Sequence, residues 1–297
     1  MTKNLNFDFF KVNMPPDADI SFEKLLKDTI NISGKDRTFA GPRYHIRLHA
    51  ITPHKGILIG EVAKIRMTDI PEKMRLTWET DPIDLDADQG LGETATFLYV
   101  PSLEVIIYQR NRDAVSYSAF CIYLEEMGDL QGTIDFDIIF EIEALRRLDE
   151  MKLIRRFDVQ IAAPGNSQIF ADLNLSPKEL TGLMNTSPKI KASFSFSMGH
   201  QKGGSLLTKD VVDICKKVFK RKIDHGAPNE DVKLLVSGKG DADANTEVID
   251  LFHDRMKEHC EVDLGSSREI SREKKQNIVY EVWKRRKSEL KKMFSED

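Results

Sequence analysis

Hydrophobic and polar residues alternate along several short stretches of the chain, a pattern typical of β-strands with one buried face. Residues 5–12 alternate in this way, and residues 44–51 and 56–67 do so on either side of a short polar turn. Between the first two of these stretches, Ser21 is a good N-cap residue and predicts a short helix over residues 21–29. We therefore expect a first strand, a helix and an antiparallel pair of strands.

A β-hairpin is predicted further along the N-terminal half. Two apolar stretches, residues 95–100 and 104–109, are separated by a Pro-Ser break, which is typical of a tight connection between strands. The segment Gln109–Asp113 is polar and partly basic, and the amphipathic stretch 115–127 that follows predicts a helix. We expect the hairpin to present this loop to a partner, with Gln109, Arg110 and Arg112 as the candidate contact residues.

Strand and helix patterns alternate through the second half of the chain. Further strands are predicted at residues 133–143, 154–162, 190–198 and 231–236, and helices at 144–153, 176–185, 208–223, 248–259 and 267–294. This order predicts an α+β fold, with a β-rich N-terminal domain over residues 1–130 followed by a mixed α/β C-terminal domain over residues 131–297 that ends in a long helix.

Composition favours a globular protein of two ordinary domains. The 297 residues are 40% hydrophobic and 31% charged, which argues against disorder. The three cysteines, Cys121, Cys215 and Cys260, are far apart and fit neither a disulfide framework nor a zinc-binding pair, so we expect a reducing cytoplasm. No secretory signal or membrane-spanning stretch is expected, because charges interrupt every apolar run.

Positive charge is concentrated in the C-terminal part, although the net charge of the chain is −4. The predicted helix 208–223 and the terminal helix each carry a basic cluster, and a glycine-rich loop, Gly199–Ser205, carries one lysine between a strand and a helix. Such clusters can neutralise phosphates, or they can simply solvate a helix face and complement its dipole. The candidate contact residues are Lys202, Lys216, Lys217, Lys220, Arg221, Lys222, Lys284 and Arg285.

Candidates for catalysis are weaker. Asp135 and Asp137 share a face of a predicted strand and Glu141 follows, so carboxylates that could hold a divalent metal are present, although such residues are more often solvated. The glycine-rich loop lacks the Lys-Ser/Thr pair of a phosphate-binding loop, and no HExxH or GxSxG motif occurs. We therefore expect no catalytic residues, no resident metal and no cofactor.

From about Asp84 onward the order of elements resembles the RexA-type phage-exclusion proteins and, more distantly, the KwaB subunit of the Kiwa defence system. The resemblance is carried by the hairpin from Leu91 to Ser116, the strand Arg156–Ile161, the stretch Asp231–Leu234 and the charged last helix. It implies a cytoplasmic homodimer that binds double-stranded DNA with little sequence preference and signals to a membrane partner encoded nearby. It also implies DNA contacts near Lys233 and Lys239.

Together these observations predict a non-enzymatic sensor that binds double-stranded DNA, or a phage protein–DNA complex, in an anti-phage defence or prophage-exclusion system. Two alternatives remain open. One is a metal-dependent nuclease or toxin of an abortive-infection system that uses Asp135, Asp137 and Glu141. The other is a sensor that binds a phage protein through the loop Gln109–Asp113.

Overall fold

The computed structural model describes residues 2–41, 44–151, 153–162, 191–197, 233–239, 246–250, 254–265 and 269–294. The chain divides into two compact units. The first combines Met1–Phe136 with Lys257–Asp297, and the second is the intervening segment Asp137–Met256. The fold is mixed α and β, with a β-rich N-terminal region and a long C-terminal helix, α7 (Arg272–Phe294), as the sequence predicts.

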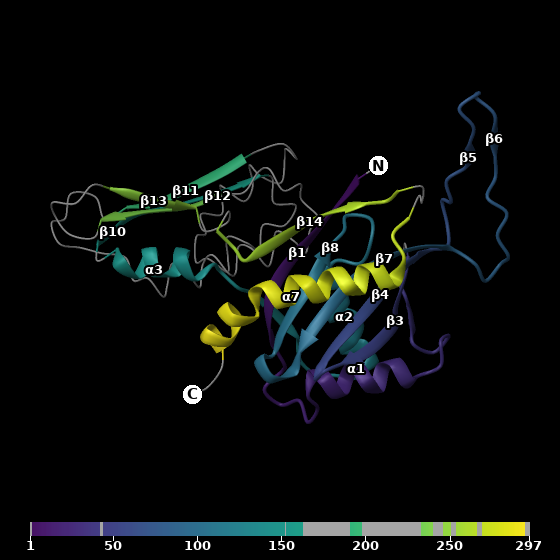
Figure 1. Ribbon diagram of the computed structural model, residues 1–297, viewed down its shortest axis with the longest axis horizontal. Helices are drawn as coiled ribbons and strands as arrows, with labels where there is room; N and C mark the ends of the chain where they lie inside the picture. The colour runs from purple at the N-terminus through teal and green to yellow at the C-terminus, as the bar shows by residue number, and fades with distance from the viewer. Residues whose placement is uncertain are drawn as a thin grey trace, which may run out of the picture. The chain divides into compact units, whose positions relative to one another are not determined.

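A large antiparallel sheet forms the centre of the first unit, with strand order β14-β1-β8-β7-β4-β3-β2, and β9 also pairs with β1 (Figure 1). At one edge, β14 from the C-terminal part of the chain pairs with the N-terminal strand β1, and the other edge is the short strand β2. The bounds are β1 Thr2–Asn13, β2 Thr38–Ala40, β3 His45–His54, β4 Ile57–Arg66, β7 Leu91–Val100, β8 Val105–Arg110, β9 Asp135–Ile138 and β14 Lys257–Asp263.

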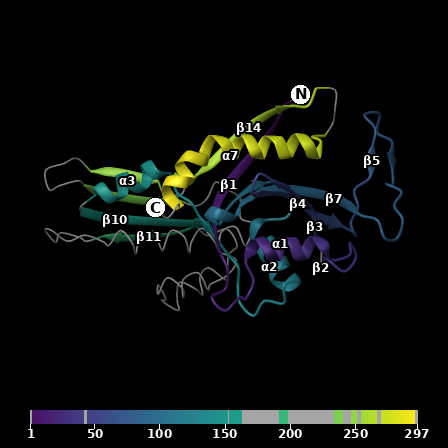
Figure 2. The ribbon, with the colours of Figure 1, turned by 60° about the horizontal axis from the view of Figure 1, so that its bottom comes forward.

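Helices cover both faces of this sheet, with α1 (Phe22–Asn31) and α2 (Tyr117–Met127) on one side and α7 on the other (Figure 2). Strand alternation supplies an apolar row to each face. Toward α7, the row across four strands is Phe9, Ile107, Leu98 and Ile59. Toward α1 and α2 it is Phe10, Ile106, Tyr99 and Leu58.

Aromatic packing fixes α1 and α2 against the sheet. The ring of Phe22 in α1 meets Tyr99 edge-on, with centroids 4.8 Å apart. In α2, Phe120 packs on Phe97 of β7 at 5.2 Å, and the Tyr123 hydroxyl accepts the Leu48 N–H at 3.0 Å. Large aromatic side chains contribute most of the burial energy in such a core. The predicted N-cap is confirmed, since the Ser21 hydroxyl accepts the Lys24 N–H at 3.2 Å.

The second unit contains a four-stranded antiparallel sheet of order β11-β10-β12-β13, together with α3. On β10, Arg156 and Asp158 share one face, and Ser197 and Ser195 of β11 lie opposite them in register. This alternation is the pattern that predicted strands 154–162 and 190–198. The bounds are α3 Ile142–Glu150, β10 Leu153–Ala162, β11 Lys191–Ser197, β12 Lys233–Lys239 and β13 Glu247–Asp250.

Two predicted elements are wrong. Within the predicted helix 248–259, residues 248–250 and 257–259 belong instead to the strands β13 and β14, which pair with β12 and β1 respectively. The predicted strand 133–143 ends at Ile138, and Glu141 is instead the N-cap position of α3. In both cases the hydrogen-bond partner is distant in sequence, so local periodicity could not reveal it.

The two units do not follow the predicted division into residues 1–130 and 131–297. That division assigned the terminal helix to the second domain, whereas the structure groups Lys257–Asp297 with the N-terminal segment. The physical reason is that β14 pairs with β1 from Thr2 to Asp8, and α7 packs against β7 and β4.

An arm projects from the first unit between β4 and β7 (Figure 1). It contains the two-residue strands β5 (Lys73–Met74) and β6 (Thr80–Asp81), which pair only with each other. Met74, Leu76 and Trp78 are largely exposed, and the backbone φ of Trp78 is +85°. The acidic stretch that follows is exposed through residues 82–89, except that Ile83 and Leu85 are half-buried, as like-charge repulsion predicts.

Within the described residues, no helix is long and apolar enough to cross a membrane.

Candidate functional site

A basic ridge lies along the exposed side of the C-terminal half of α7. We define it as Lys284, Arg285, Lys287, Lys291 and Lys292, all of which are exposed. The helix presents them outward because Val279, Val282, Trp283 and Leu290 are buried on its opposite side. Residues three, four and seven positions apart share a helix face, so Lys284, Lys287 and Lys291 form one line.

The two ridge residues that the sequence analysis selected have acidic neighbours. The Lys284 ammonium is 2.5 Å from a Glu281 carboxylate oxygen. The Arg285 guanidinium is 3.5 Å from the Glu258 carboxylate and donates to the Cys260 Sγ at 3.0 Å. These pairs are exposed on at least one side, and exposed ion pairs exchange readily with other anions. Arg285 is therefore held toward β14, where a phosphate would have to compete with Glu258.

The other three ridge residues were not selected from the sequence. Lys287, Lys291 and Lys292 have no ion pair with any residue that the structure describes. Their signal was present in the sequence as the spacing of lysines in the last helix. They complement the C-terminal end of the helix dipole, and they leave the ridge with a positive charge that no described carboxylate compensates.

Beneath the N-terminal half of α7 lies a polar layer that sequence patterns did not predict. Glu61 of β4 is 3% exposed and pairs with Arg272 at 2.9 Å. Lys275 donates to the Thr94 hydroxyl at 2.9 Å, and the Gln276 amide donates to Thr52 at 3.3 Å. These contacts join one helix to three strands, so they fix the direction of α7 and thereby the placement of the basic ridge.

His49 lies close to the polar layer, at a β-bulge of β3 between Leu48 and Ala50. Its pKa is lowered from the ordinary value of 6.5, first by burial and then by the positive charges of Arg272 and Arg47. Both effects disfavour the charged imidazolium. The position therefore holds a neutral imidazole at neutral pH and adds no positive charge to this side of the molecule.

The remaining predicted nucleic-acid contacts are only partly covered by the structure. Lys233 and Lys239 are the first and last residues of β12, opposite Gln160 and Leu153 of β10. They belong to the second unit, whereas Lys284 and Arg285 belong to the first. The others lie outside the described residues, namely Lys202, Lys216, Lys217, Lys220, Arg221 and Lys222. Nucleic-acid contacts at these positions therefore stay a prediction.

The predicted partner-binding loop is wrong at Gln109. Strand β8 extends to Arg110, and Gln109 is 4% exposed. Its side-chain oxygen accepts the Thr96 N–H at 3.1 Å, and the Asn111 amide donates to the Thr94 carbonyl at 3.4 Å. These amide side chains continue the contact between β7 and β8 where the backbone ladder has ended, so they hold the strands together rather than face a partner.

The other two residues of the predicted loop differ from each other. The Arg110 guanidinium lies 3.7 Å from the buried Asp8 carboxylate, which a buried acidic group requires for charge compensation. Arg112 is exposed in the following turn. Of the three residues predicted to bind a partner, Arg112 is the exposed one, and its role in binding stays a prediction.

The candidate metal carboxylates are separated by the end of a strand. Asp135 and Asp137 are half-buried on β9, and the Glu141 backbone N–H donates to the Asp254 carbonyl at 3.0 Å at the start of α3. The described part of the chain contains no group of three or more histidine, cysteine, aspartate or glutamate side chains that could hold a metal ion.

Comparison with known proteins identifies a family without an assigned activity. Residues 1–292 match the model of DUF6731, described as a family of unknown function. The chain belongs to this family. A search of curated proteins found no match.

Proposed function

We propose that the protein is a non-enzymatic sensor that binds double-stranded DNA, or a phage protein–DNA complex, without reading the base sequence. The observation that carries the proposal is the basic ridge on α7, five exposed cationic side chains on a helix held rigidly against a sheet. Lysine and arginine contacts to phosphates supply most of the affinity of sequence-independent binding. They position a protein on a duplex without conveying sequence information.

The charge distribution along α7 favours a phosphate backbone over an acidic protein surface as the ligand. Lys284, Lys287 and Lys291 follow one line at intervals of three and four residues, and Lys292 adds a second cation at the end. A helix rises about 1.5 Å per residue, so the line spans roughly 10 Å. DNA carries one negative charge per about 1.7 Å of axis, which gives such a row several phosphates to contact.

The test measures duplex affinity as a function of salt. Fluorescence anisotropy with two unrelated duplexes of equal length should give equal affinities, and binding should weaken steeply from about 50 to 200 mM salt. The substitutions Lys287→Gln, Lys291→Gln and Lys292→Gln, made together, should flatten the dependence of log affinity on log salt by about 0.9 for each phosphate that the variant no longer neutralises.

The matched control changes three other exposed lysines of the same unit, Lys24, Lys35 and Lys73, to glutamine. This variant has the same net charge as the ridge variant and should bind like the unaltered protein. Equal weakening in both variants would show that net charge alone matters, and unaltered binding by the ridge variant would remove the ridge from the proposal. A third variant with Lys216, Lys217 and Lys220 changed to Glu tests the predicted second cluster.

The non-enzymatic part of the proposal has its own test. Plasmid DNA and RNA incubated with the protein in magnesium or manganese should remain intact, with or without EDTA. Cleavage that EDTA abolishes, and that Asp135→Asn and Asp137→Asn also abolish, would instead support the metal-dependent nuclease.

The biological setting is proposed from the resemblance to phage-exclusion proteins. In this setting the protein acts in the cytoplasm as a homodimer and signals phage infection to a membrane effector encoded nearby. Cells that carry the gene with its neighbours should resist phage infection, and ridge substitutions should remove resistance while leaving protein levels unchanged. Resistance that survives the removal of DNA binding would favour a phage protein as the trigger.

A further inference from the structure

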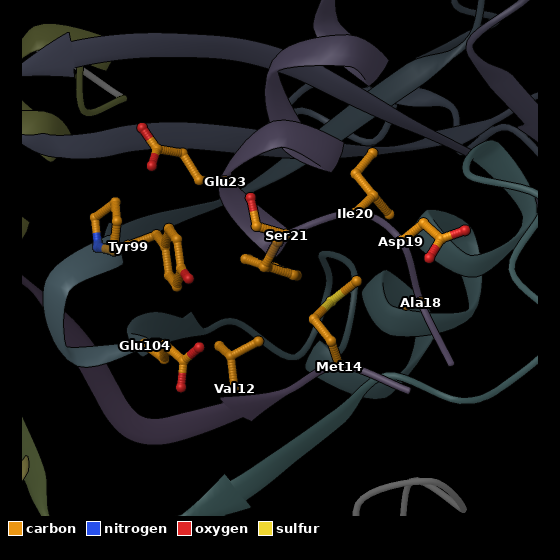
Figure 3. A pocket seen from close by; sticks show the side chains of 11 residues that line it. Val12, Met14, Ala18, Asp19, Ile20, Ser21, Glu23, Tyr99 and Glu104 are labelled. Carbon is orange, nitrogen blue, oxygen red and sulfur yellow. The ribbon is translucent and has the colours of Figure 1, made fainter. Parts of the chain in front are cut away.

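A cavity of about 460 Å³ opens beside the N-terminal end of α1, in the first unit (Figure 3). Small-molecule pockets in proteins measure about 300–1,000 Å³, so its size suits a small ligand. Three segments build it. They are the end of β1 with the linker that follows, the first turn of α1, and the turn from Tyr99 to Glu104 that connects β7 and β8.

The wall of the cavity contains a buried tyrosine whose hydroxyl has no partner among the described residues. Tyr99 is 3% exposed, and its ring is held edge-on against Phe22. Its hydroxyl points into the cavity (Figure 3), and no described residue forms a hydrogen bond with it. The hydroxyl borders the cavity and is not fully enclosed by protein atoms, so a molecule in the cavity can reach it, and tyrosine hydroxyls in such positions usually have a hydrogen-bond partner. The position thus has an unused hydrogen-bonding group aimed at the space where a ligand would lie.

Three carboxylates are among the residues that line the cavity, and no lysine or arginine is. They are Asp19, Glu23 and Glu104; Glu23 and Glu104 lie toward the end of the cavity that holds Tyr99, and Asp19 lies toward the other end (Figure 3). The pKa of Tyr99 is raised above its ordinary range, first by burial and then by Glu104 and Glu23. The phenol therefore stays neutral, and it sits in a negative electrostatic potential.

The neighbouring cations reduce this potential without reversing it. Lys11 pairs with Glu104 at 3.1 Å and Lys27 pairs with Glu23 at 2.6 Å, each from outside the cavity lining. Asp19 is exposed and has no ion pair among the described residues. The positive end of the α1 dipole is compensated by Glu23 in its first turn. One uncompensated negative charge remains at the opening.

The turn that presents Glu104 is rigid. Glu104 lies in the left-handed region with a φ of +50°, at the end of the 3₁₀ helix η1 (Pro101–Leu103). Its N–H donates to the Pro101 carbonyl at 3.2 Å, and its carbonyl accepts the Val12 N–H at 2.7 Å. Because non-glycine residues rarely adopt this conformation, these two hydrogen bonds hold it, and they fix the backbone from which the Glu104 side chain projects.

We propose that this cavity binds a small primary ammonium ion that carries an apolar group. The ammonium donates to the Glu104 carboxylate and to the Tyr99 oxygen, while Asp19 and Glu23 attract it through their field. The apolar group packs on Phe22, Met14 and Pro101 along the walls. None of the five residues of the basic ridge lines the cavity, so the proposed ligand is bound by other side chains than the proposed DNA.

The experiment titrates the full chain with three probes of the same shape and different charge. These are phenethylammonium, the neutral 2-phenylethanol and the anionic phenylacetate, followed by calorimetry or by NMR saturation transfer. We expect phenethylammonium to bind about tenfold more tightly than 2-phenylethanol, because a charge-assisted hydrogen bond is about twice as strong as a neutral one. Phenylacetate should bind most weakly.

Two substitutions test the cavity residues with little change of volume. Tyr99→Phe should weaken phenethylammonium binding about fivefold, the effect of removing one hydrogen bond, and Glu104→Gln should remove the preference for the ammonium probe. Tyr44→Phe and Glu93→Gln are the controls, since neither residue lines the cavity. The proposal would be overturned if phenethylammonium did not bind at about 10 mM, or if 2-phenylethanol bound equally well. It would also be overturned if Tyr99→Phe and Glu104→Gln had no effect on binding in variants that remain folded.

Discussion

At the scale of single residues, the pairing of Glu61 with Arg272 ties the first turn of α7 to β4. The Glu61 side chain is 3% exposed, whereas Arg272 is half-exposed. One Glu61 oxygen accepts from Arg272, and the other, Oε1, has no described partner. A buried carboxylate requires a nearby cation, because water no longer stabilises its charge. Removal of Arg272 therefore leaves the buried Glu61 carboxylate without its counterion.

Arg272→Ala should lower the free energy of unfolding by about 2–4 kcal/mol, because it leaves a buried carboxylate unpaired. Adding Glu61→Gln to that variant should recover part of the stability, since a neutral amide needs no counterion. Urea unfolding of the two single variants and the double variant measures this coupling. Purely additive effects would mean that the two side chains do not interact in solution.

His49 makes the stability of the first unit depend on pH. Its folded-state pKa lies below 6.5, so the unfolded chain binds more protons than the folded chain between these two values. Stability from this group is therefore complete above pH 6.5 and is lost as the pH falls through the folded-state pKa. The charged groups around it are Arg272, Arg47, Glu61 and Arg37.

The prediction is that His49→Gln flattens the decline of stability between about pH 7 and 5 while changing little above pH 7. Urea unfolding of both proteins at several pH values measures it. His259→Gln, at an exposed position of β14, is the control. If the pH profile of the His49 variant is unchanged, then the lowered pKa does not contribute to stability.

At the scale of elements, the sequence predicts the helices and strands whose signals lie within their own segments. The hairpin of β7 and β8, the Ser21-capped helix α1 and the terminal helix α7 follow from alternation, capping and charge spacing. Strand β14 could not be predicted, because its pairing partner β1 is at the other end of the chain. The basic ridge was only partly predicted, also because of a distant contact. Helix periodicity identifies its exposed lysines, but it does not reveal that Glu258 of β14 lies beside Arg285.

The arm between β4 and β7 is an element whose exposure is directly measurable, because the chain contains two tryptophans. Trp78 is 89% exposed at its tip, and Trp283 of α7 is 5% exposed. We expect two fluorescence components, of which only the red-shifted one is quenched readily by acrylamide. Trp78→Phe should remove that component and leave the melting temperature unchanged, because the side chain buries little surface.

Trp283→Phe is the complementary measurement. It should remove the blue-shifted component and lower the stability, because it changes a packed core side chain. A shielded Trp78 in dilute solution would indicate that the arm is covered, for example by a second copy of the chain. Concentration dependence of the quenching would then distinguish covering by a second copy from covering within one molecule.

At the scale of the whole molecule, the chain completes its first unit only after the second has been synthesised. Met1–Phe136 lacks β14 and α7, so the face of the sheet with Phe9, Ile107 and Leu98 would be open to water. Apolar burial of about 25 cal/mol per Å² is the main source of folding free energy. The N-terminal segment alone therefore cannot form a stable unit, contrary to what a boundary at residue 130 would suggest.

The points where the chain enters and leaves the second unit are adjacent. The Met256 N–H donates to the Ile139 carbonyl at 2.8 Å, and the Glu141 N–H donates to the Asp254 carbonyl at 3.0 Å. A short glycine-serine linker can therefore replace residues 140–255 without stretching the backbone, since each extended residue spans about 3.3–3.6 Å.

A protein that joins residues 1–139 to residues 256–297 through such a linker should fold by itself. Circular dichroism should show one cooperative unfolding transition, and the Trp283 emission should remain blue-shifted, since Trp283 is buried within the first unit. Residues 1–139 alone should instead aggregate or bind a hydrophobic dye. If the N-terminal segment folds cooperatively without residues 256–297, then β14 and α7 are accessories to the first unit, and the discontinuous division is wrong.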